Sequence, residues 1–188
     1  MILIVLIGTW TIRSVPWGVA QPSISLTQLV SPFRRKFYGF SSGYRGKSYT
    51  ASKFALEAIS EALAQEVKAF GIKVAVVQPG IINTSMANEI VVASNGSVYP
   101  HGRRVAGMFA ASLKTPTAPE LVADKVRQII ESDSPQFRHP VGPDAAPFLA
   151  WRASMSDEQW VDWGALDDAS RYAAVERAFG LNARPIPP

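Results

Sequence analysis

Residues 49–84 constrain the fold more than any other part of the sequence. From Ala51 to Phe70, apolar residues recur every three or four positions, which predicts one long amphipathic helix. Gly71 follows as its C-terminal cap, and residues 72–77 form a short β-branched run, typical of a strand buried on both faces of a parallel sheet. A long helix joined to such a strand by a tight turn predicts an α/β protein.

Tyr49 and Lys53 lie four residues apart in the predicted helix, so their side chains share one helical face. A free tyrosine has a pKa of about 10. An ammonium about 4 Å away favours the phenolate by about 4 kcal/mol at an effective dielectric near 20, before desolvation opposes it. Such a tyrosine exchanges a proton near neutral pH, which suits acid/base work on a hydroxyl or a carbonyl. The same spacing also occurs by chance on surface helices.

The order of four features resembles the short-chain dehydrogenase/reductase family. These are Tyr-x-x-x-Lys with small residues inside it, the long helix, the buried strand, and a Pro-Gly-x-x-x-Thr loop that ends at Thr84. The resemblance implies that Tyr49 is the catalytic acid/base, and that Lys53 lowers its pKa and holds the nicotinamide ribose of NAD or NADP. It also implies that the loop contacts the nicotinamide carboxamide through Pro79, Gly80, Ile82 and Thr84.

The resemblance implies a partial Rossmann-like doubly wound parallel sheet with flanking helices, followed here by a C-terminal helical extension. Family members usually carry a glycine-rich phosphate turn and a cofactor-selecting residue before the tyrosine, and neither is visible in residues 1–48. We therefore expect the cofactor-binding half to be missing. Lys36 occupies the position of the family's catalytic serine, thirteen residues before the tyrosine, so the nearby Ser42 is the candidate.

The charge pattern favours a division of the chain into three parts. Residues 1–48 carry basic residues and no acidic ones, whereas all 15 acidic residues follow. We predict an atypical basic segment over 1–48, the C-terminal half of a Rossmann-like domain over 49–145, and the helical extension over 146–188. The basic segment contains no recognisable nucleic-acid-binding module, so no nucleic-acid partner is predicted.

Cysteine and histidine usage limits the chemistry of the chain. With no cysteine, disulfides and thiolate metal sites are excluded, and a reducing compartment is permitted. The two histidines are too scattered for a metal cluster. We predict a cytoplasmic protein without a membrane span, because the apolar run over residues 1–7 is too short to cross a bilayer and suits a core strand.

A competing interpretation is a serine hydrolase that uses Ser41. Residues 39–43 match Gly-x-Ser-x-Gly, the nucleophile elbow of such enzymes, and Asp133 and His139 follow in the required order. The elbow needs a buried strand before it and a helix after it. A basic stretch over residues 34–36 precedes it instead.

Several elements are expected after Thr84. For residues 85–114 the resemblance implies a mobile lid over the substrate, with an apolar content that suits a hydrophobic alcohol or ketone, whereas the residues alone suit a surface loop with a short helix. Thr-x-x-Glu at 117–120 predicts a capping box before a helix over 121–131, and residues 137–141 predict a closing strand. A second capping box over 156–159 opens a short helix, and a further helix covers 165–179. The predicted buried stripe of the first helix comprises Val122, Val126, Ile129 and Ile130.

Two functional hypotheses follow. The first is an NAD(P)-dependent oxidoreductase that interconverts a secondary alcohol and a carbonyl, with a small hydrophobic alcohol or ketone as substrate. The second is a catalytically dead remnant that serves as an assembly or binding module. The resemblance also implies that the helix over 49–70 pairs with its counterpart in a homo-oligomer, for which Phe54, Ala58 and Leu63 are the candidate contact residues.

Overall fold

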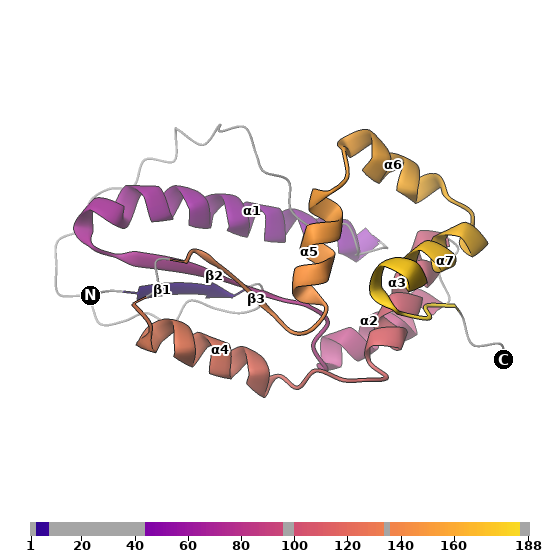
Figure 1. The fold of residues 1–188 in the computed structure, drawn as a ribbon, viewed down its shortest axis with the longest axis horizontal. Helices are drawn as coiled ribbons and strands as arrows, with labels where there is room; N and C mark the ends of the chain where they lie inside the picture. Colours follow the sequence, from indigo (N-terminus) through magenta and orange to yellow (C-terminus); the bar gives the residue numbers. More distant parts are fainter. Residues whose placement is uncertain (1–2, 8–43, 96–99, 134–135, 185–188) are drawn as a thin grey trace.

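The computed structural model describes residues 3–7, 44–95, 100–133 and 136–184, with the backbone alone for 3–7, 44–49 and 93–95. Three strands of the described chain form one parallel sheet in the order β1 (Leu3–Ile7), β2 (Lys73–Pro79), β3 (Arg138–Val141). Helix α1 (Tyr44–Val67) covers one face of the sheet and α4 (Glu120–Glu131) covers the other (Figure 1). Helices on both faces of a parallel sheet confirm the predicted α/β class with a partial doubly wound sheet.

Helix α1 and strand β2 form the predicted helix–turn–strand unit. The helix continues into a single 3-10 turn, η1 (Lys68–Phe70), and ends at Gly71, whose φ of 70° is the left-handed conformation of a C-terminal cap. Its beginning at Tyr44 lies five residues before the predicted start at Tyr49. The difference arises because Gly46 and Lys47 interrupt the apolar pattern without breaking the helix.

Strand β2 is more deeply buried than β3. Five consecutive residues, 74–78, are buried, as predicted for a strand covered on both faces. Ala75 and Val77 form a core cluster with Ile129 of α4 and Val141 of β3. The short apolar run at the beginning of the sequence is a strand, as predicted, and pairs in parallel with β2 from Leu3 to Ile7.

Two details of α4 differ from the prediction. Ile129 is buried and Val122 and Val126 pack against the same cluster, but Ile130 is 55% exposed because it lies about 100° around the helix from Ile129. The capping box at 117–120 does not form: Pro119 is the residue before the helix, and it makes no side-chain cap. Thr117 instead bridges to Ile82.

Residues 85–95 and 100–112 form two helices, α2 (Ser85–Asn95) and α3 (Pro100–Ser112), where a lid or a loop with one short helix was expected. Gly102 and Gly107 lie inside α3. A Cβ at Gly107 would overlap the backbone carbonyl oxygen of Ala183, so this glycine permits a close approach between two chain segments.

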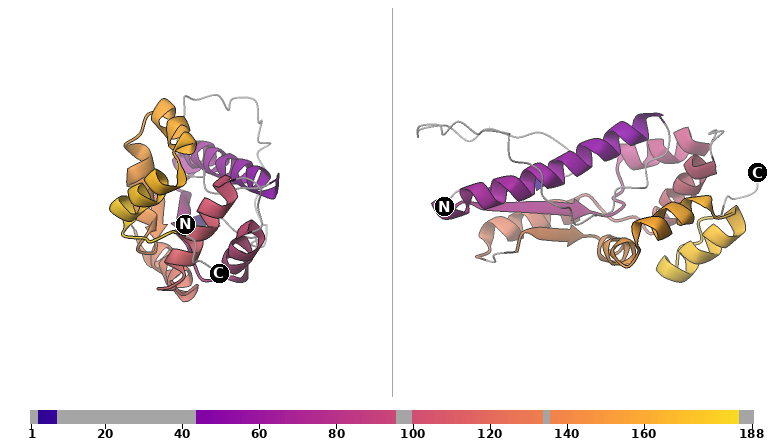
Figure 2. Two further views of the ribbon diagram at one scale, coloured as in Figure 1. Left: turned by 90° about the vertical axis from the view of Figure 1, so that its right-hand side faces the viewer. Right: turned by 90° about the horizontal axis from the view of Figure 1, so that it is seen from above.

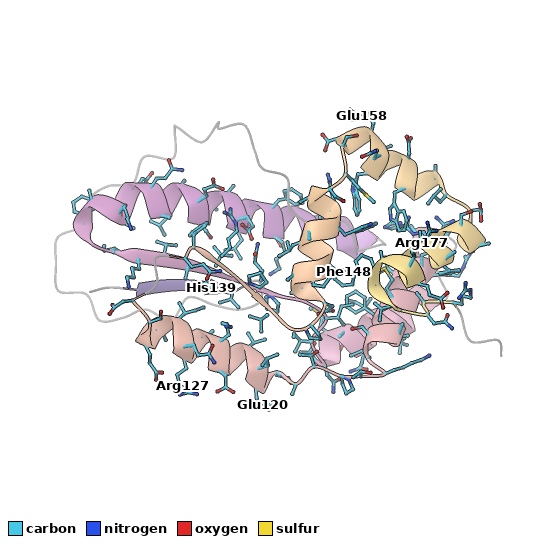
Figure 3. All side chains as sticks on the ribbon, viewed as in Figure 1. Glu120, Arg127, His139, Phe148, Glu158 and Arg177 are labelled. Carbon is cyan, nitrogen blue, oxygen red and sulfur yellow. The ribbon has the colours of Figure 1, made fainter. Side chains whose placement is uncertain are left out.

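The C-terminal extension contains α5 (Ala145–Ala153), α6 (Asp157–Ala165) and α7 (Asp168–Phe179). The views in Figure 2 show these helices beyond one end of the sheet, beside α2 and α3. Phe148 of α5, labelled in Figure 3, packs in one cluster with Met108 of α3 and Val175 of α7. The capping box predicted over 156–159 is confirmed, and Gly180 ends α7 in the left-handed conformation.

The tryptophans of the extension pack together. Trp151 makes edge-to-face contacts with Trp160 and Trp163, at centroid distances of 5.7 and 4.9 Å.

Buried Arg104 joins α3 to the turn between α6 and α7, donating to Asp168 Oδ1 at 2.6 Å and to the carbonyl of Leu166 at 2.8 Å. None of the helices in the described ranges has the length and apolar character needed to cross a membrane.

Candidate active site

Helix α1 carries both halves of the Tyr-x-x-x-Lys motif. Tyr49 and Lys53 are separated by four residues of continuous helix, so their backbones place them on one face. The Lys53 side chain is partly buried, and this burial lowers its pKa from the ordinary value of 10.5. The side chain of Tyr49 and the whole of Ser42 lie outside the described residues.

A network of charged and polar side chains holds α1 against the sheet. Glu57, one turn after Lys53, accepts a hydrogen bond from Gln78 Nε2 of β2 at 2.6 Å. Its other carboxylate oxygen accepts from Arg138 Nε of β3 at 2.9 Å, and Arg138 also donates to Glu61 at 3.0 Å. Burial lowers the pKa of Arg138, but the hydrogen bonds and charges of Glu57 and Glu61 outweigh it, so its pKa is raised. The network links α1 to both strands.

The loop after β2 is fixed by hydrogen bonds of its own backbone. Gly80 N–H donates to the carbonyl of Val141 at 2.9 Å, and Asn83 N–H donates to the carbonyl of Thr117, also at 2.9 Å. Thr84 caps α2, because its hydroxyl oxygen accepts from Ala87 N–H at 3.3 Å. The described loop residues Pro79, Gly80, Ile82 and Thr84 therefore lie together at the carboxyl end of β2, where ligands bind in open α/β sheets.

Asp144 is a site residue that the sequence reasoning missed. Its Oδ2 accepts from Ile81 N–H at 2.8 Å, and its carboxylate lies so close to Gly80 that a Cβ there would overlap Oδ1. Burial raises the pKa of Asp144, while the backbone N–H groups of Ile81 and Asp144 and the Ser112 hydroxyl oppose the rise less strongly. Oδ1 is buried and has no partner of regular hydrogen-bond geometry in the described part of the chain.

A signal for Asp144 was present in the sequence. Pro79-Gly80 ends one strand, and Gly142-Pro143-Asp144 follows the next strand along the chain. Because the carboxyl ends of adjacent parallel strands meet at one edge of a sheet, these two turns had to lie side by side.

The groups proposed for a serine hydrolase have other partners. Asp133 pairs with Lys73 at 3.6 Å, and the ring nitrogen Nε2 of His139 lies 3.0 Å from the carbonyl oxygen of Gln136. Ser41 lies outside the described residues. Within the described ranges, no three histidine or carboxylate side chains gather as a metal site would require.

Comparison with known proteins identifies relatives of one kind. A family model described as short chain dehydrogenase matches residues 37–95. Oxidoreductase BOA17 of Botryotinia fuckeliana is 36% identical over 60% of this chain and 43% of its own length. 17-beta-hydroxysteroid dehydrogenase type 6 of Rattus norvegicus is 27% identical over 70% of this chain and 48% of its own length. A solved short-chain dehydrogenase from Streptomyces avermitilis covers 70% of this chain and 46% of its own, with 27% identity and a TM-score of 0.45.

These matches confirm the resemblance to the short-chain dehydrogenase/reductase family, which the motifs over residues 49–84 had indicated. The family model covers both the Tyr-x-x-x-Lys motif and the loop after β2. The chain spans about half the length of the curated relatives it matches.

Proposed function

We propose that this protein is an NAD(P)-dependent oxidoreductase that interconverts a secondary alcohol and a carbonyl. One observation carries the proposal: the hydrogen bond between Glu57 and Gln78 joins the helix of Tyr49 and Lys53 to the strand that ends in the nicotinamide-type loop. This contact supports assigning the two motifs to one site. Family resemblance supports the reaction class.

Each residue has a role in this proposal. The nicotinamide, when bound, exchanges a hydride with the substrate carbon. Tyr49 gives or takes the proton of the substrate oxygen, and the Lys53 ammonium on the same face stabilises the phenolate and binds the ribose hydroxyls. Ser42 is the candidate for a second hydrogen bond to the substrate oxygen.

The described residues fit the nicotinamide end of such a cofactor. The Lys53 side chain is partly buried, and the loop from Pro79 to Thr84 is held rigid by bonds to Val141, Asp144 and Thr117. A rigid loop presents its polar groups without a further ordering cost, which favours binding. We assign the carboxamide contacts to Pro79, Gly80, Ile82 and Thr84, and either NAD or NADP satisfies this part of the site.

A small hydrophobic alcohol or ketone is the proposed substrate class. The α2–α3 hairpin beside the loop carries apolar side chains, with Met86 and Val92 exposed. The rat relative is named for a hydroxysteroid, which is an alcohol on an apolar frame. Both observations favour an apolar substrate surface.

Calorimetry with NAD and NADP, followed by turnover assays on a panel of hydrophobic secondary alcohols, tests the proposal. We expect saturable binding of one dinucleotide, and Tyr49→Phe should lower kcat by about a hundredfold or more without abolishing that binding. Tyr44→Phe is the matched control, because it removes the same hydroxyl from another face of α1. Failure of wild-type protein to bind either dinucleotide would refute the proposal.

The second candidate is an assembly or binding module without catalysis. It is favoured by apolar side chains on α1, where Phe54 is 46% and Ile59 is 49% exposed. A second copy of α1 is the proposed partner. Light scattering should then report a dimer, and an effect of Tyr49→Phe on a measured turnover would eliminate this candidate.

A further inference from the structure

The Glu57 carboxylate occupies an unusual position, because each of its oxygens bonds a different strand. Oε1 accepts from Gln78 of β2 at 2.6 Å, and Oε2 accepts from Arg138 of β3 at 2.9 Å. Glu57 is only 9% exposed, and so is Gln78. Burying a carboxylate costs free energy unless it is paired and hydrogen-bonded. Both oxygens of Glu57 meet this requirement.

The three elements that meet at Glu57 carry or lead into the described parts of the candidate site. Lys53 lies one helical turn before Glu57, and Gln78 immediately precedes the Pro79-Gly80 turn. Arg138 begins the strand that leads to Asp144. A shift of α1 by one residue along its axis moves Lys53 by about 1.5 Å relative to the loop, which is enough to spoil a catalytic geometry.

Hydrogen bonds add direction to the packing of α1 against the sheet. The half-buried apolar side chains of α1 near Glu57 include the large Leu56 and Leu63 as well as the small Ala58 and Ala62. Ser60 is fully buried, but its hydroxyl donates to the carbonyl of Leu56 in its own helix at 2.5 Å and so is used within α1. Apolar contacts are non-directional, whereas the two bonds of Glu57 fix one register.

We propose that Glu57 is a positioning residue that sets the register of α1 on the sheet, and through it the distance from Tyr49 and Lys53 to the loop over residues 79–84. The effect of this register on catalysis rests on the proposed function. The structural content of the inference, a coupling between α1 and the loop, stands independently. Because Tyr49 and Lys53 share one helix, a change of register moves both together and leaves their mutual spacing unchanged.

Hydrogen exchange of the loop amides tests the coupling without any cofactor. Glu57→Gln removes the carboxylate charge that pairs with Arg138, and the bond to Gln78 then persists only if the Gln78 amide turns over to accept from the new side chain. We expect the amides of Gly80, Ile81 and Asn83 to exchange about tenfold faster. Glu61→Gln is the matched control, since Glu61 contacts the same Arg138 from a side chain that is 52% exposed, and it should change these rates less than about twofold.

The reciprocal variant Glu57→Gln with Gln78→Glu restores an amide–carboxylate bond in the opposite direction. It should recover at least part of the lost protection. Equal rates in Glu57→Gln and Glu61→Gln would overturn the inference, and so would a uniform acceleration over the whole chain, because that reports global destabilisation.

Steady-state kinetics with the accepted dinucleotide test the catalytic meaning. Glu57→Gln should lower kcat about tenfold or more while the pH dependence of kcat keeps its wild-type position, because the Tyr49–Lys53 pair is intact. A merely structural loss would reduce the amount of folded enzyme and leave the kcat of the folded fraction unchanged, which would contradict the inference. If the exchange results hold but wild-type protein turns over no dinucleotide substrate, the coupling is supported and the proposed function is refuted.

Discussion

Asp144 accepts a hydrogen bond from the backbone N–H of Ile81 at 2.8 Å, although 63 residues separate them in the sequence. The bond connects the turn after β2 to the beginning of α5, and so connects the nicotinamide-type loop to the C-terminal helices. Gly80 permits this contact, since any side chain there would meet the same carboxylate. The loop of the candidate site therefore depends on a residue far along the chain.

Gly80→Ala should destabilise the protein by about 2 kcal/mol, because the added methyl group overlaps the Asp144 carboxylate and overpacks the turn. Among the described glycines, positive φ angles occur at Gly71, Gly142 and Gly180 but not at Gly80, so the expected cost is steric and not conformational. Urea denaturation measures the loss.

Gly164→Ala is the control for this substitution, because nothing lies within 4 Å of a Cβ at that helical position. It should leave stability unchanged or raise it by about 0.5 kcal/mol. Adding Asp144→Ala to Gly80→Ala should remove much of the penalty. Independent, additive effects of these two changes would contradict the contact.

The raised pKa of Asp144 predicts a definite sign for the pH dependence of stability. Burial raises this pKa above the ordinary 3.8, so the folded protein keeps a proton that the unfolded chain has released. The free energy of unfolding therefore contains a contribution that falls as pH rises from about 4 through the folded pKa and then levels off. Asp144→Asn removes it, because the amide oxygen still accepts from Ile81 and cannot ionise.

Urea denaturation of both proteins at intervals between about pH 4 and about pH 7 measures this difference. The stability of Asp144→Asn relative to wild type should increase with pH over the window. Asp162→Asn, at an exposed carboxyl on α6, is the control for removing one acidic residue. A difference that is constant or decreases with pH would show that Asp144 is not the group responsible.

Arg104→Met should cost about 2 kcal/mol of stability, since the guanidinium joins α3 to Asp168 and to the carbonyl of Leu166 from a buried position. Arg127→Met is the control, because Arg127 lies on the outer side of α4 and makes ion pairs only within that helix among the described contacts (Figure 3). The control should change stability by about 0.5 kcal/mol or less. Similar losses in both variants would contradict the role of Arg104.

Local patterns predicted much of this fold, because the helix–turn–strand unit around Gly71 depends on residues adjacent in sequence. The loop interpretation of residues 85–114 was wrong for the opposite reason, since the structure there depends on residues distant in sequence. A glycine such as Gly107 usually indicates a loop, yet it lies inside α3. A glycine is needed there because the backbone carbonyl of Ala183, 76 residues further along the chain, leaves no room for a Cβ. Likewise, the motif predicted roles for Tyr49, Lys53 and the loop, whereas Asp144 and the Glu57–Gln78 bond depend on how strands and helices pack. Such contacts follow from tertiary structure; for Asp144 the sequence offers only its position in the turn after the closing strand, and for the Glu57–Gln78 bond it offers no comparable signal.

The two capping-box motifs provide the sharpest test of that distinction. Ser156 and Gln159 form both reciprocal bonds, with Gln159 N–H donating to Ser156 Oγ at 3.2 Å and Ser156 N–H donating to Gln159 Oε1 at 2.8 Å. Thr117 has the same motif but does not cap α4, whose first residue is Glu120. Ser156→Ala should therefore cost about 1 kcal/mol of stability and Thr117→Ala less than about half of that, as measured by thermal or urea denaturation. A capping motif stabilises a helix only where its hydrogen bonds form. Equal losses in the two variants would therefore show that Thr117 also caps a helix.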